Sequence, residues 1–487
     1  MPRSPIIAGF HPDPSICRVG EDYFLVNSSF EYFPGVPVFT SRDLTLWRQL
    51  GNVLDRSSQL SVREGIGGAS GGIYAPTIRH HDGRFWMTTT NIHDIARGHL
   101  IVHAEDPAGP WSDPVYTAGL LGIDPDLAWD DDGRCLLTWS DVVRGGISQA
   151  VVDPVTGEVL SEAVSLWHGT GGAHAEGPHL LRRGDWWYLL VAEGGTGAGH
   201  MVTVARSKRP DGPFEANPAN PILTHRSTSD AVQATGHADM LELADGSWAM
   251  VHLGTRPRGS FPRWHTNGRE TFLAGISWID DWPVVNEDQF EAGRVSNAFV
   301  EEFTAARLDP RWISPGVEPA TFAVPDAAGL RLSTNGAADG NGPLLAVRAA
   351  DQTWAARAHG QGDYALEVRI DARHRAAVRR VAGRIEARIE IGPFSQIIVG
   401  GDAATDAALE VRTVTPAVER GMPSGPDVIL LGTTLGEDFQ ELTRLDGRYL
   451  STEVAGGFTG RVVGVSAIGG NAVITRFAYA STEDSAI

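Results

Sequence analysis

The chain has 487 residues, which is enough for two or three domains of ordinary size, each with its own hydrophobic core. Its composition, 42% hydrophobic and 21% charged, is that of a folded globular protein and excludes wholesale disorder. The formal net charge of −20 argues against nucleic acid or an anionic membrane as a partner, because both bind basic surfaces, and it favours a neutral substrate.

The N-terminal residues 1–5 lead directly into the first structured motif, without the apolar segment of a secretory signal. No stretch of the sequence approaches the run of apolar residues that a membrane span needs. We therefore expect a cytoplasmic protein that does not insert into a membrane.

One motif occurs five times in the first 250 residues. Each copy carries a polar or aromatic residue, a Pro or small residue and an aliphatic residue, followed by a turn and an aromatic-rich strand. The turns recur at a spacing of roughly fifty to sixty residues, at Asp22, Asp82, Asp132, Gly184 and Asp245. This spacing is too long for a pair of sandwich strands and suits a four-stranded propeller blade. The pattern predicts a five-bladed β-propeller.

The leading residues of the five motifs should meet in space, because the innermost strand of every propeller blade lines the central channel. The converging positions are Asp13, Tyr74, Asp124, Glu176 and His237. Asp-Pro pairs also start turns, so a purely structural role stays open for Asp13 and Asp124. Glu176 lies between an alanine and a glycine and has no obvious role in a turn.

Three carboxylates in one pocket suit glycoside hydrolysis, which needs one protonated carboxyl to assist the leaving oxygen and one ionised carboxylate. An inverting enzyme keeps this pair about 6.5–9.5 Å apart, so that a water molecule fits between the two groups. A third carboxylate raises the pKa of the acid by like-charge repulsion and helps it to hold a proton near neutral pH. Asp13, Asp124 and Glu176 can fill these three roles.

The repeats end near Asn286, and a different pattern begins near Phe303. Alternating strands such as 364–370 and 383–389, separated by Gly- and Asp-rich turns, predict a jelly-roll-like β-sandwich. The fold class is therefore all-β. The predicted organisation is a catalytic propeller over residues 1–290, a linker over 291–302, and a sandwich over 303–487 that contributes a loop to the active site.

The sequence strongly resembles glycoside hydrolase family 43, the family of β-xylosidases and α-L-arabinofuranosidases. The matching runs are residues 9–16, 29–37, 71–76, 122–125, 176–180 and 268–271. The resemblance covers the whole propeller, and the layout is similar to that of members with a C-terminal sandwich. It implies an inverting mechanism in which Asp13 is the general base on water, Glu176 is the general acid, and Asp124 tunes and orients the acid.

The same resemblance implies roles in substrate binding for five further residues. Arg269 would hydrogen-bond sugar hydroxyls, and Phe30 and Tyr74 would form an apolar wall of the terminal-sugar subsite. Phe458, on a glycine-rich sandwich loop, would close one side of the pocket so that only a chain end enters, and His237 would lie at the channel floor. Simpler alternatives stay open: Arg269 could pair with its acidic neighbour, Phe30 could be plain core, and His237 could be a satisfied core histidine.

The resemblance implies no required cofactor. In some relatives a calcium ion is held through water at the channel floor, which makes Ca²⁺ a candidate ligand of the channel and His237 its candidate water-mediated neighbour. Relatives with this layout are often dimers or tetramers, so a homo-oligomer is also expected.

The predicted activity is that of an inverting, exo-acting glycosidase, with a small oligosaccharide as its partner. It would release terminal β-D-xylose, α-L-arabinofuranose or both from xylo-oligosaccharides or arabinoxylan fragments. Tyr74 stands where xylosidases often have Trp, and the context of residues 71–76 is similar to that of arabinofuranosidases.

Two alternatives to this activity stay open. Retaining five-bladed hydrolases of fructans and sucrose carry an Asn-Asp-Pro-Asn-Gly entry motif, which residues 11–15 lack. A non-catalytic carbohydrate-binding propeller would not need all three acids.

Overall fold

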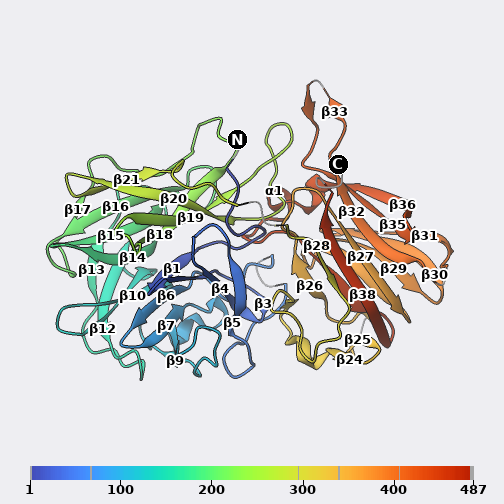
Figure 1. Ribbon diagram of the computed structural model, residues 1–487, viewed down its shortest axis with the longest axis horizontal. Helices are drawn as coiled ribbons and strands as arrows, with labels where there is room; N and C mark the ends of the chain where they lie inside the picture. The colour runs from blue at the N-terminus through green and yellow to red at the C-terminus, as the bar shows by residue number, and fades with distance from the viewer. Residues whose placement is uncertain are drawn as a thin grey trace.

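The computed structural model describes residues 3–65, 68–293, 296–337, 340–404, 406–419 and 421–482. Two β-rich parts lie side by side, a propeller built from the N-terminal part of the chain and a sandwich built from the C-terminal part (Figure 1). The helices in these ranges are short: the 3₁₀ helices Ile92–Arg97, Pro319–Thr321 and Gly447–Leu450, and the α-helix α1 (Thr452–Ala455). None of the described helices is long and apolar enough to cross a membrane.

The propeller has five blades, each a four-stranded antiparallel sheet whose strands follow one another in sequence order. The first two blades contain β1 (Ser15–Val19), β2 (Asp22–Val26), β4 (Gly35–Ser41), β5 (Arg48–Leu54), and β6 (Thr77–His81), β7 (Arg84–Thr89), β8 (Leu100–Ala104), β9 (Val115–Tyr116). The third blade contains β10 (Gly122–Trp129), β11 (Cys135–Asp141), β12 (Ile147–Val152) and β13 (Val164–Trp167). The last two contain β14 (Glu176–Arg183), β15 (Trp186–Glu193), β16 (Met201–Ser207), β17 (Glu215–Ala216), and β18 (Gln233–Glu242), β19 (Trp248–Thr255), β20 (Glu270–Ile279), β21 (Trp282–Asn286). The predicted five-bladed propeller is confirmed.

The blade hairpins follow from local sequence. Between β6 and β7, Asp82 and Gly83 have φ values of 49° and 73°, the left-handed conformation that a two-residue type I′ turn requires and that Asp and Gly tolerate. The strands after these turns are buried on both faces, because blades pack against neighbours on either side. In β7 every residue from 85 to 89 is buried, which is why such strands read as apolar runs rather than as alternating patterns.

The ring closes between the first and fifth blades. The amide of Ile6 donates a hydrogen bond to the carbonyl of Thr271 at 2.9 Å, so the N-terminal segment is tied to the fifth blade. In the interior, Leu25 of the first blade packs in one buried cluster with Val251 and Leu273 of the fifth. Closure removes the free edge that an open array of blades would expose.

The sandwich consists of two antiparallel sheets over one core. One sheet contains β24 (Ala323–Asp326), β25 (Gly329–Ser333), β38 (Asn471–Ser481), β27 (Trp354–Gln361), β32 (Ala408–Val414), β35 (Val428–Leu435) and β36 (Asp438–Asp446), with β22 (Phe299–Glu301) paired to β38. The other contains β26 (Leu345–Arg348), β37 (Val462–Ala467), β28 (Tyr364–Asp371), β29 (His374–Val381), β30 (Arg384–Ile391) and β31 (Phe394–Asp402). A small hairpin is formed by β33 (Val418–Glu419) and β34 (Met422–Pro423). The predicted sandwich fold is confirmed, but its first strand, β22, lies within the predicted linker 291–302. Residues 294–295 of that linker lie outside the described ranges.

The two parts are docked through strand pairing and a shared apolar cluster. β3 (Tyr32–Phe33) of the propeller pairs with β23 (Ser314–Pro315), which precedes the sandwich sheets. Phe10 and Tyr32 of the propeller pack in one buried cluster with Ile313, Ala346 and Val462. This docking brings the segment between α1 and β37 to the end of the propeller channel.

Candidate active site

One cavity collects side chains from all five blades and from the sandwich. It is lined by Asp13, Phe30, Tyr74, Ala75, Ile123, Asp124, Glu176, Thr196, His237, Arg269 and Phe458. The structure therefore brings together all eight side chains that the sequence analysis singled out. Ala75, Ile123 and Thr196 line the same cavity but were not singled out.

The acids reach the cavity because the inner strands are distorted where they begin. The pairing register shifts between Ile123 and Asp126 in β10 and between Glu176 and His179 in β14. Asp13 and Asp124 both have a φ of 55°, in the left-handed region that Asp tolerates better than most residues. Bulges and backbone strain of this kind re-aim side chains and cluster at active sites.

The fourth blade supplies its carboxylate one residue earlier than the first and third blades do. Its left-handed position belongs to Gly177, with a φ of 57°. A Cβ atom at residue 177 would lie 2.8 Å from the ring of His237, which is too close for non-bonded atoms. Glycine is therefore required at this position, and Glu176 carries the acid beside it.

Asp13 is the acid that its surroundings hold ionised. Burial by itself would raise the pKa of Asp13, but Arg269, His237 and the Ser28 hydroxyl together hold that pKa below its ordinary value. Nη1 of Arg269 lies 3.2 Å from Oδ1 of Asp13, and Ser28 donates a short hydrogen bond to Oδ2. An ionised carboxylate in this position can accept a proton from water.

Glu176 and Asp124 have the opposite electrostatics. Burial and the charge of Asp13 raise the pKa of Glu176 to about 7, although Arg269 lowers it. Burial, followed by the charges of Glu176 and Asp13, raises the pKa of Asp124 well above its ordinary value. Asp124 also accepts a hydrogen bond from the amide of Gly177 at 3.2 Å. Because neighbouring carboxyls titrate as a pair, this pair retains a proton near neutral pH.

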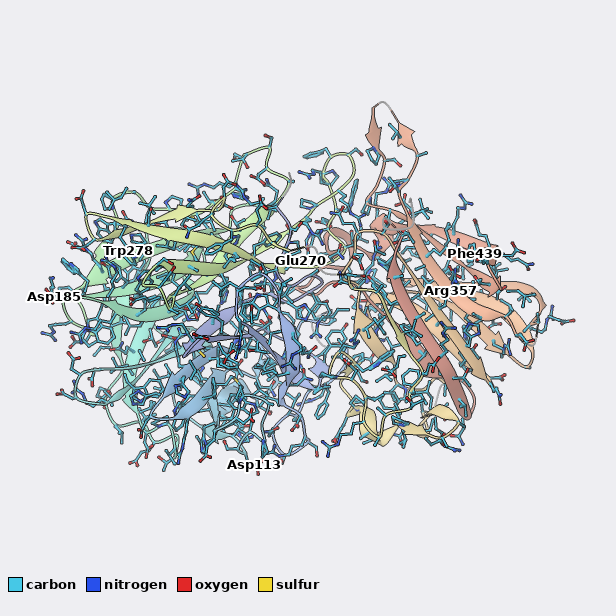
Figure 2. All side chains as sticks on the ribbon, in the orientation of Figure 1. Asp113, Asp185, Glu270, Trp278, Arg357 and Phe439 are labelled. Carbon is cyan, nitrogen blue, oxygen red and sulfur yellow. The ribbon has the colours of Figure 1, made fainter. Side chains whose placement is uncertain are left out.

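Arg269 is directed into the cavity. Its Nη1 donates to Asp13 at 3.2 Å and to Oγ1 of Thr196 at 2.8 Å. Glu270, which lies where the propeller meets the sandwich (Figure 2), pairs instead with Arg256 at 2.6 Å. The alternative in which Arg269 pairs with its acidic neighbour is therefore wrong. The only sequence signal for Thr196 is the glycine-rich run 194–199 around it.

Three aromatic rings form one wall of the cavity. The ring centroids of Phe30 and Tyr74 are 5.9 Å apart, and Phe458 lies 6.1 Å from Phe30 and 6.3 Å from Tyr74. The amide of Phe458 donates a hydrogen bond to Oγ of Ser70 at 2.7 Å, which anchors the sandwich loop on the propeller. Phe458 thus narrows the cavity from the sandwich side.

Arg79 of β6 lies in the propeller channel. It contacts Ser15, Asp126 and Asp239, each of which comes two positions after a residue that lines the cavity. Its guanidinium lies 2.7 Å from Oδ1 of Asp126 and 2.7 Å from Oδ2 of Asp239. Its Nη2 is 3.0 Å from Nδ1 of His179, and its Nη1 donates to Oγ of Ser15 at 3.2 Å. These partners belong to β10, β18, β14 and β1, so one cation of the second blade contacts the inner strands of the other four.

The carboxylates of the channel do not fit direct ligation of calcium. Ca²⁺ takes about six to eight oxygen ligands, whereas the carboxylates of Asp126 and Asp239 already bond the guanidinium of Arg79. Across the described ranges, no group of three or more His, Cys, Asp and Glu side chains is placed to hold a metal ion. His237 is buried and 3.5 Å from Asp13, and burial lowers its pKa to about 4.

Comparison with known proteins adds independent findings. The profile described as Glycosyl hydrolases family 43 matches residues 2–283. Over 289 residues the chain is 44% identical to a non-reducing end α-L-arabinofuranosidase of Bacteroides ovatus, which covers 59% of this chain and 54% of that protein. Over 299 residues it is 45% identical to a xylosidase/arabinosidase of Butyrivibrio fibrisolvens, covering 58% and 56%. The chain thus spans about half the length of the curated relatives it matches.

Solved structures resemble the chain along its whole length. Xyloglucan PUL GH43B of Bacteroides ovatus superposes with a TM-score of 0.85 at 30% identity, covering 99% of each chain. A xylan β-1,4-xylosidase of Bacillus halodurans gives a TM-score of 0.85 at 27% identity, covering 99% of this chain and 100% of the other. The arrangement of a propeller followed by a sandwich is therefore shared with these proteins.

The pKa shifts predict a bell-shaped dependence of kcat/KM on pH. The pKa of Glu176 is raised to about 7, so its proton is present below that pH and is lost as the pH rises through it. The pKa of Asp13 lies below its ordinary value of 3.8, so this group stays ionised until the pH falls to strongly acidic values. Activity should therefore fall on the alkaline side near pH 7 and on the acidic side only below about pH 4.

The measurement is kcat/KM on a soluble glycoside from acidic to alkaline pH. As a comparison, Asp124→Asn removes one carboxyl of the pair, whose charge opposes loss of the pair's last proton, so the alkaline limb should move to lower pH. Full activity of the wild type up to strongly alkaline pH would contradict the assignment of the proton to Glu176.

Proposed function

The chain belongs to Glycosyl hydrolases family 43, and on that premise we propose that it is an inverting, exo-acting glycosidase that removes terminal pentose from short xylan-derived oligosaccharides. The observation that carries this proposal is the electrostatic division of one cavity. The pKa of Asp13 is held down and that of Glu176 is raised to about 7, so a base and an acid coexist near neutral pH. A non-catalytic module does not account for this division. A retaining enzyme also pairs a protonated acid with an ionised carboxylate, so the configuration of the product separates it from an inverting one.

In the proposed reaction, Asp13 takes a proton from a water molecule whose oxygen bonds to the anomeric carbon. Glu176 gives its proton to the departing glycosidic oxygen as the carbon–oxygen bond breaks. The hydroxyl thus arrives on the face opposite the leaving group, and the configuration inverts. The hydrogen bond from the Gly177 amide favours the ionised form of Asp124, and on that ground we assign the proton of the pair to Glu176.

The wall of the cavity suits the end of a sugar chain. Phe30 and Tyr74 offer apolar faces to a pentose ring, and Phe458 closes the cavity from the sandwich side. Arg269, held by Asp13 and Thr196, directs guanidinium donors towards sugar hydroxyls. Relatives named as xylosidases and as arabinofuranosidases support xylose and arabinofuranose as the released terminal sugars.

We also propose that the channel needs no metal ion, because Arg79 supplies the positive charge there. Asp126 and Asp239 are 0% exposed, and an unpaired carboxylate in such a place would be strongly unfavourable. The guanidinium of Arg79 bonds both carboxylates, offsets one of their two negative charges and is linked covalently to the chain.

The proposed activity is tested with aryl β-D-xylopyranoside and aryl α-L-arabinofuranoside as paired substrates. We expect turnover of both, with NMR showing the inverted anomer as the first product. Asp13→Ala should lower kcat by about 10²–10⁴-fold, because the water then lacks its base. A retained configuration would favour the fructan-type mechanism, and no turnover of either substrate would favour a binding module.

The role of Glu176 is separated from that of Asp13 by the leaving group. A nitrophenolate departs without a proton, so Glu176→Ala should lose little activity on a nitrophenyl pentoside but about 10²–10⁴-fold on a xylo-oligosaccharide. Asp13→Ala, the matched variant, should lose activity on both substrates. An equal loss for Glu176→Ala on the two substrates would exclude it as the general acid.

The metal proposal is tested by chelation and by removal of Arg79. The wild type should keep its kcat/KM and Tm with EDTA or with added Ca²⁺. Arg79→Ala leaves two buried carboxylates unpaired and should lower the free energy of unfolding by about 3–5 kcal/mol, measured in urea. Added guanidinium ion should raise the Tm of this variant and not that of the wild type.

The exposed Arg84, at the start of β7 in the same hairpin, provides the control Arg84→Ala, which should change the unfolding free energy little. Should Arg79→Ala fail to fold, Arg79→Lys keeps the charge with fewer donors and should show a smaller loss. Inactivation of the wild type by EDTA, reversed by Ca²⁺, would disprove the proposal.

A further inference from the structure

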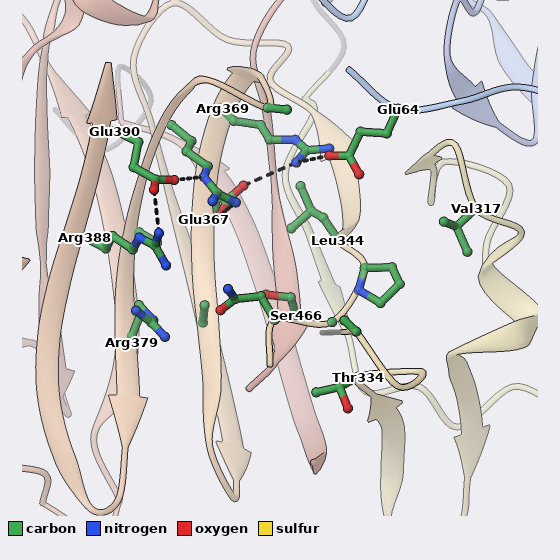
Figure 3. A pocket seen from close by; sticks show the side chains of 18 of the residues that line it. Glu64, Val317, Thr334, Leu344, Glu367, Arg369, Arg379, Arg388, Glu390 and Ser466 are labelled. Atoms are coloured by element: carbon green, nitrogen blue, oxygen red, sulfur yellow. Dashed lines mark hydrogen bonds and ion pairs between the residues drawn. The ribbon is translucent and has the colours of Figure 1, made fainter. Parts of the chain in front are cut away.

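A second cavity, of about 520 Å³, lies on the sandwich sheet formed by β28, β29 and β30 (Figure 3). The cavity is on the face of that sheet that is turned away from the sandwich core. On β28, Leu366 and Val368 point into the core, whereas the alternating residues Glu367 and Arg369 line the cavity. Leu344 and, from the propeller, Glu64 complete its walls. Its volume is in the range of small-ligand sites, and it shares no lining residue with the catalytic cavity.

The floor of this cavity is a hollow surrounded by charged side chains. Ala377 of β29 pairs across the sheet with Glu367 on β28 and with Arg388 on β30. Along β29, Arg375 and Arg379 lie two residues before and after it and share its face. The short side chain of Ala377 leaves space between these four long charged side chains. A ligand in that space would contact all four.

Arginines outnumber glutamates in the lining, and Glu386, just outside it, pairs with Arg379 at 3.0 Å. The cavity lining contains four arginines and three glutamates: Arg369, Arg375, Arg379, Arg388, Glu64, Glu367 and Glu390. Glu390 is shared by Arg375 and Arg388 (Figure 3). Arg369 is 3% exposed and pairs with Glu64 at 2.8 Å, yet its Nε and Nη2 are buried with no hydrogen-bond partner among the described residues. Nε of Arg388 is likewise buried with no hydrogen-bond partner among the described residues. Buried donors without an acceptor are unfavourable, and rotation of these side chains towards an acceptor-rich ligand in the cavity would satisfy them.

The crowding of cations is also evident at Arg379. Burial lowers its pKa, and the charges of Arg388 and Arg375 lower it further, although Glu386 and Glu367 oppose them. An added negative charge in the hollow would relieve this repulsion.

We propose that this cavity binds a carboxylate-bearing sugar, namely a uronic acid unit of an oligosaccharide. The planar guanidinium fork matches a carboxylate in a bidentate arrangement. Oε1 of Glu367 is 3.6 Å from Nη1 of Arg369 and has no hydrogen-bond partner in the described part of the chain, so it could accept from a sugar hydroxyl after rotating into the cavity. The described lining contains no aromatic ring on which a neutral sugar could stack, so charge is the basis of recognition.

This inference rests on the proposed function, since the uronic acid would be a substituent of the same class of pentose oligosaccharide. One segment links the two cavities: Gly65 lines the second cavity, and its amide donates to Oε2 of Glu31 at 2.8 Å. Glu31 follows Phe30 of the catalytic wall. An acidic branch held on the sandwich therefore lies against the same segment that supports the pentose subsite.

The test is calorimetric titration of the full chain with glucuronic acid, in the presence of saturating xylose to occupy the catalytic cavity. We expect saturable binding that xylose does not displace. Arg379→Gln should weaken it about tenfold or more, the effect of losing one charge-assisted interaction. Arg379→Lys, which keeps the charge and loses the fork, should give an intermediate loss. The exposed propeller variant Arg134→Gln should bind as the wild type does.

Three outcomes would overturn the inference: displacement of glucuronate by xylose, wild-type affinity in Arg379→Gln, or inorganic phosphate binding more tightly than glucuronate. The last would indicate a general anion site. An unchanged kcat/KM of Arg379→Gln on an aryl pentoside would show that the fold and the catalytic cavity are intact. Because binding is measured without turnover, its failure is distinguishable from a failure of the proposed activity.

Discussion

The contact of Arg79 with the inner strands of the other four blades is the interaction on which the arrangement of the propeller depends. Its partners lie two residues beyond the residues that line the catalytic cavity: Ser15 follows Asp13, Asp126 follows Asp124, and Asp239 follows His237. A shift of any inner strand at Arg79 would therefore move a side chain of the candidate active site. The buried carboxylates need this cation, because unpaired charges inside a protein are strongly unfavourable. The contacts of Arg79 thus hold the inner strands together and also position the side chains that line the candidate active site.

The chemistry of the site follows from a second constraint, which is that three buried carboxyls cannot all be ionised. Arg269 and Ser28 favour the charged form of Asp13, and the cost of burial then falls on Asp124 and Glu176. Asp124 and Glu176 together therefore retain a proton near neutral pH, and no neighbouring group has to supply it. The division of roles between identical functional groups is set by their surroundings.

The sandwich completes the candidate active site and carries the second cavity, for which we propose a role in recognition. Its docking depends on the pairing of β3 with β23 and on the cluster around Phe10 and Tyr32. This docking places Phe458 within ring contact of Phe30, so the width of the catalytic cavity depends on the interface between the two parts. The same sandwich presents an arginine-rich hollow whose charge balance differs from that of the acidic chain as a whole.

The sequence by itself determined the five blades, the sandwich and the positions of the acids, because turns such as Asp82–Gly83, strand patterns and repeat spacing act over a few residues. Tertiary structure alone decided which charges meet: Arg79 in the channel, Thr196 on Arg269, and Arg256 on Glu270. It also decided that a side chain at Gly177 would strike His237, which places the fourth-blade acid at Glu176. Such contacts join residues far apart in the chain, and their partners depend on side-chain directions that bulges and domain docking set, so no local pattern carries them.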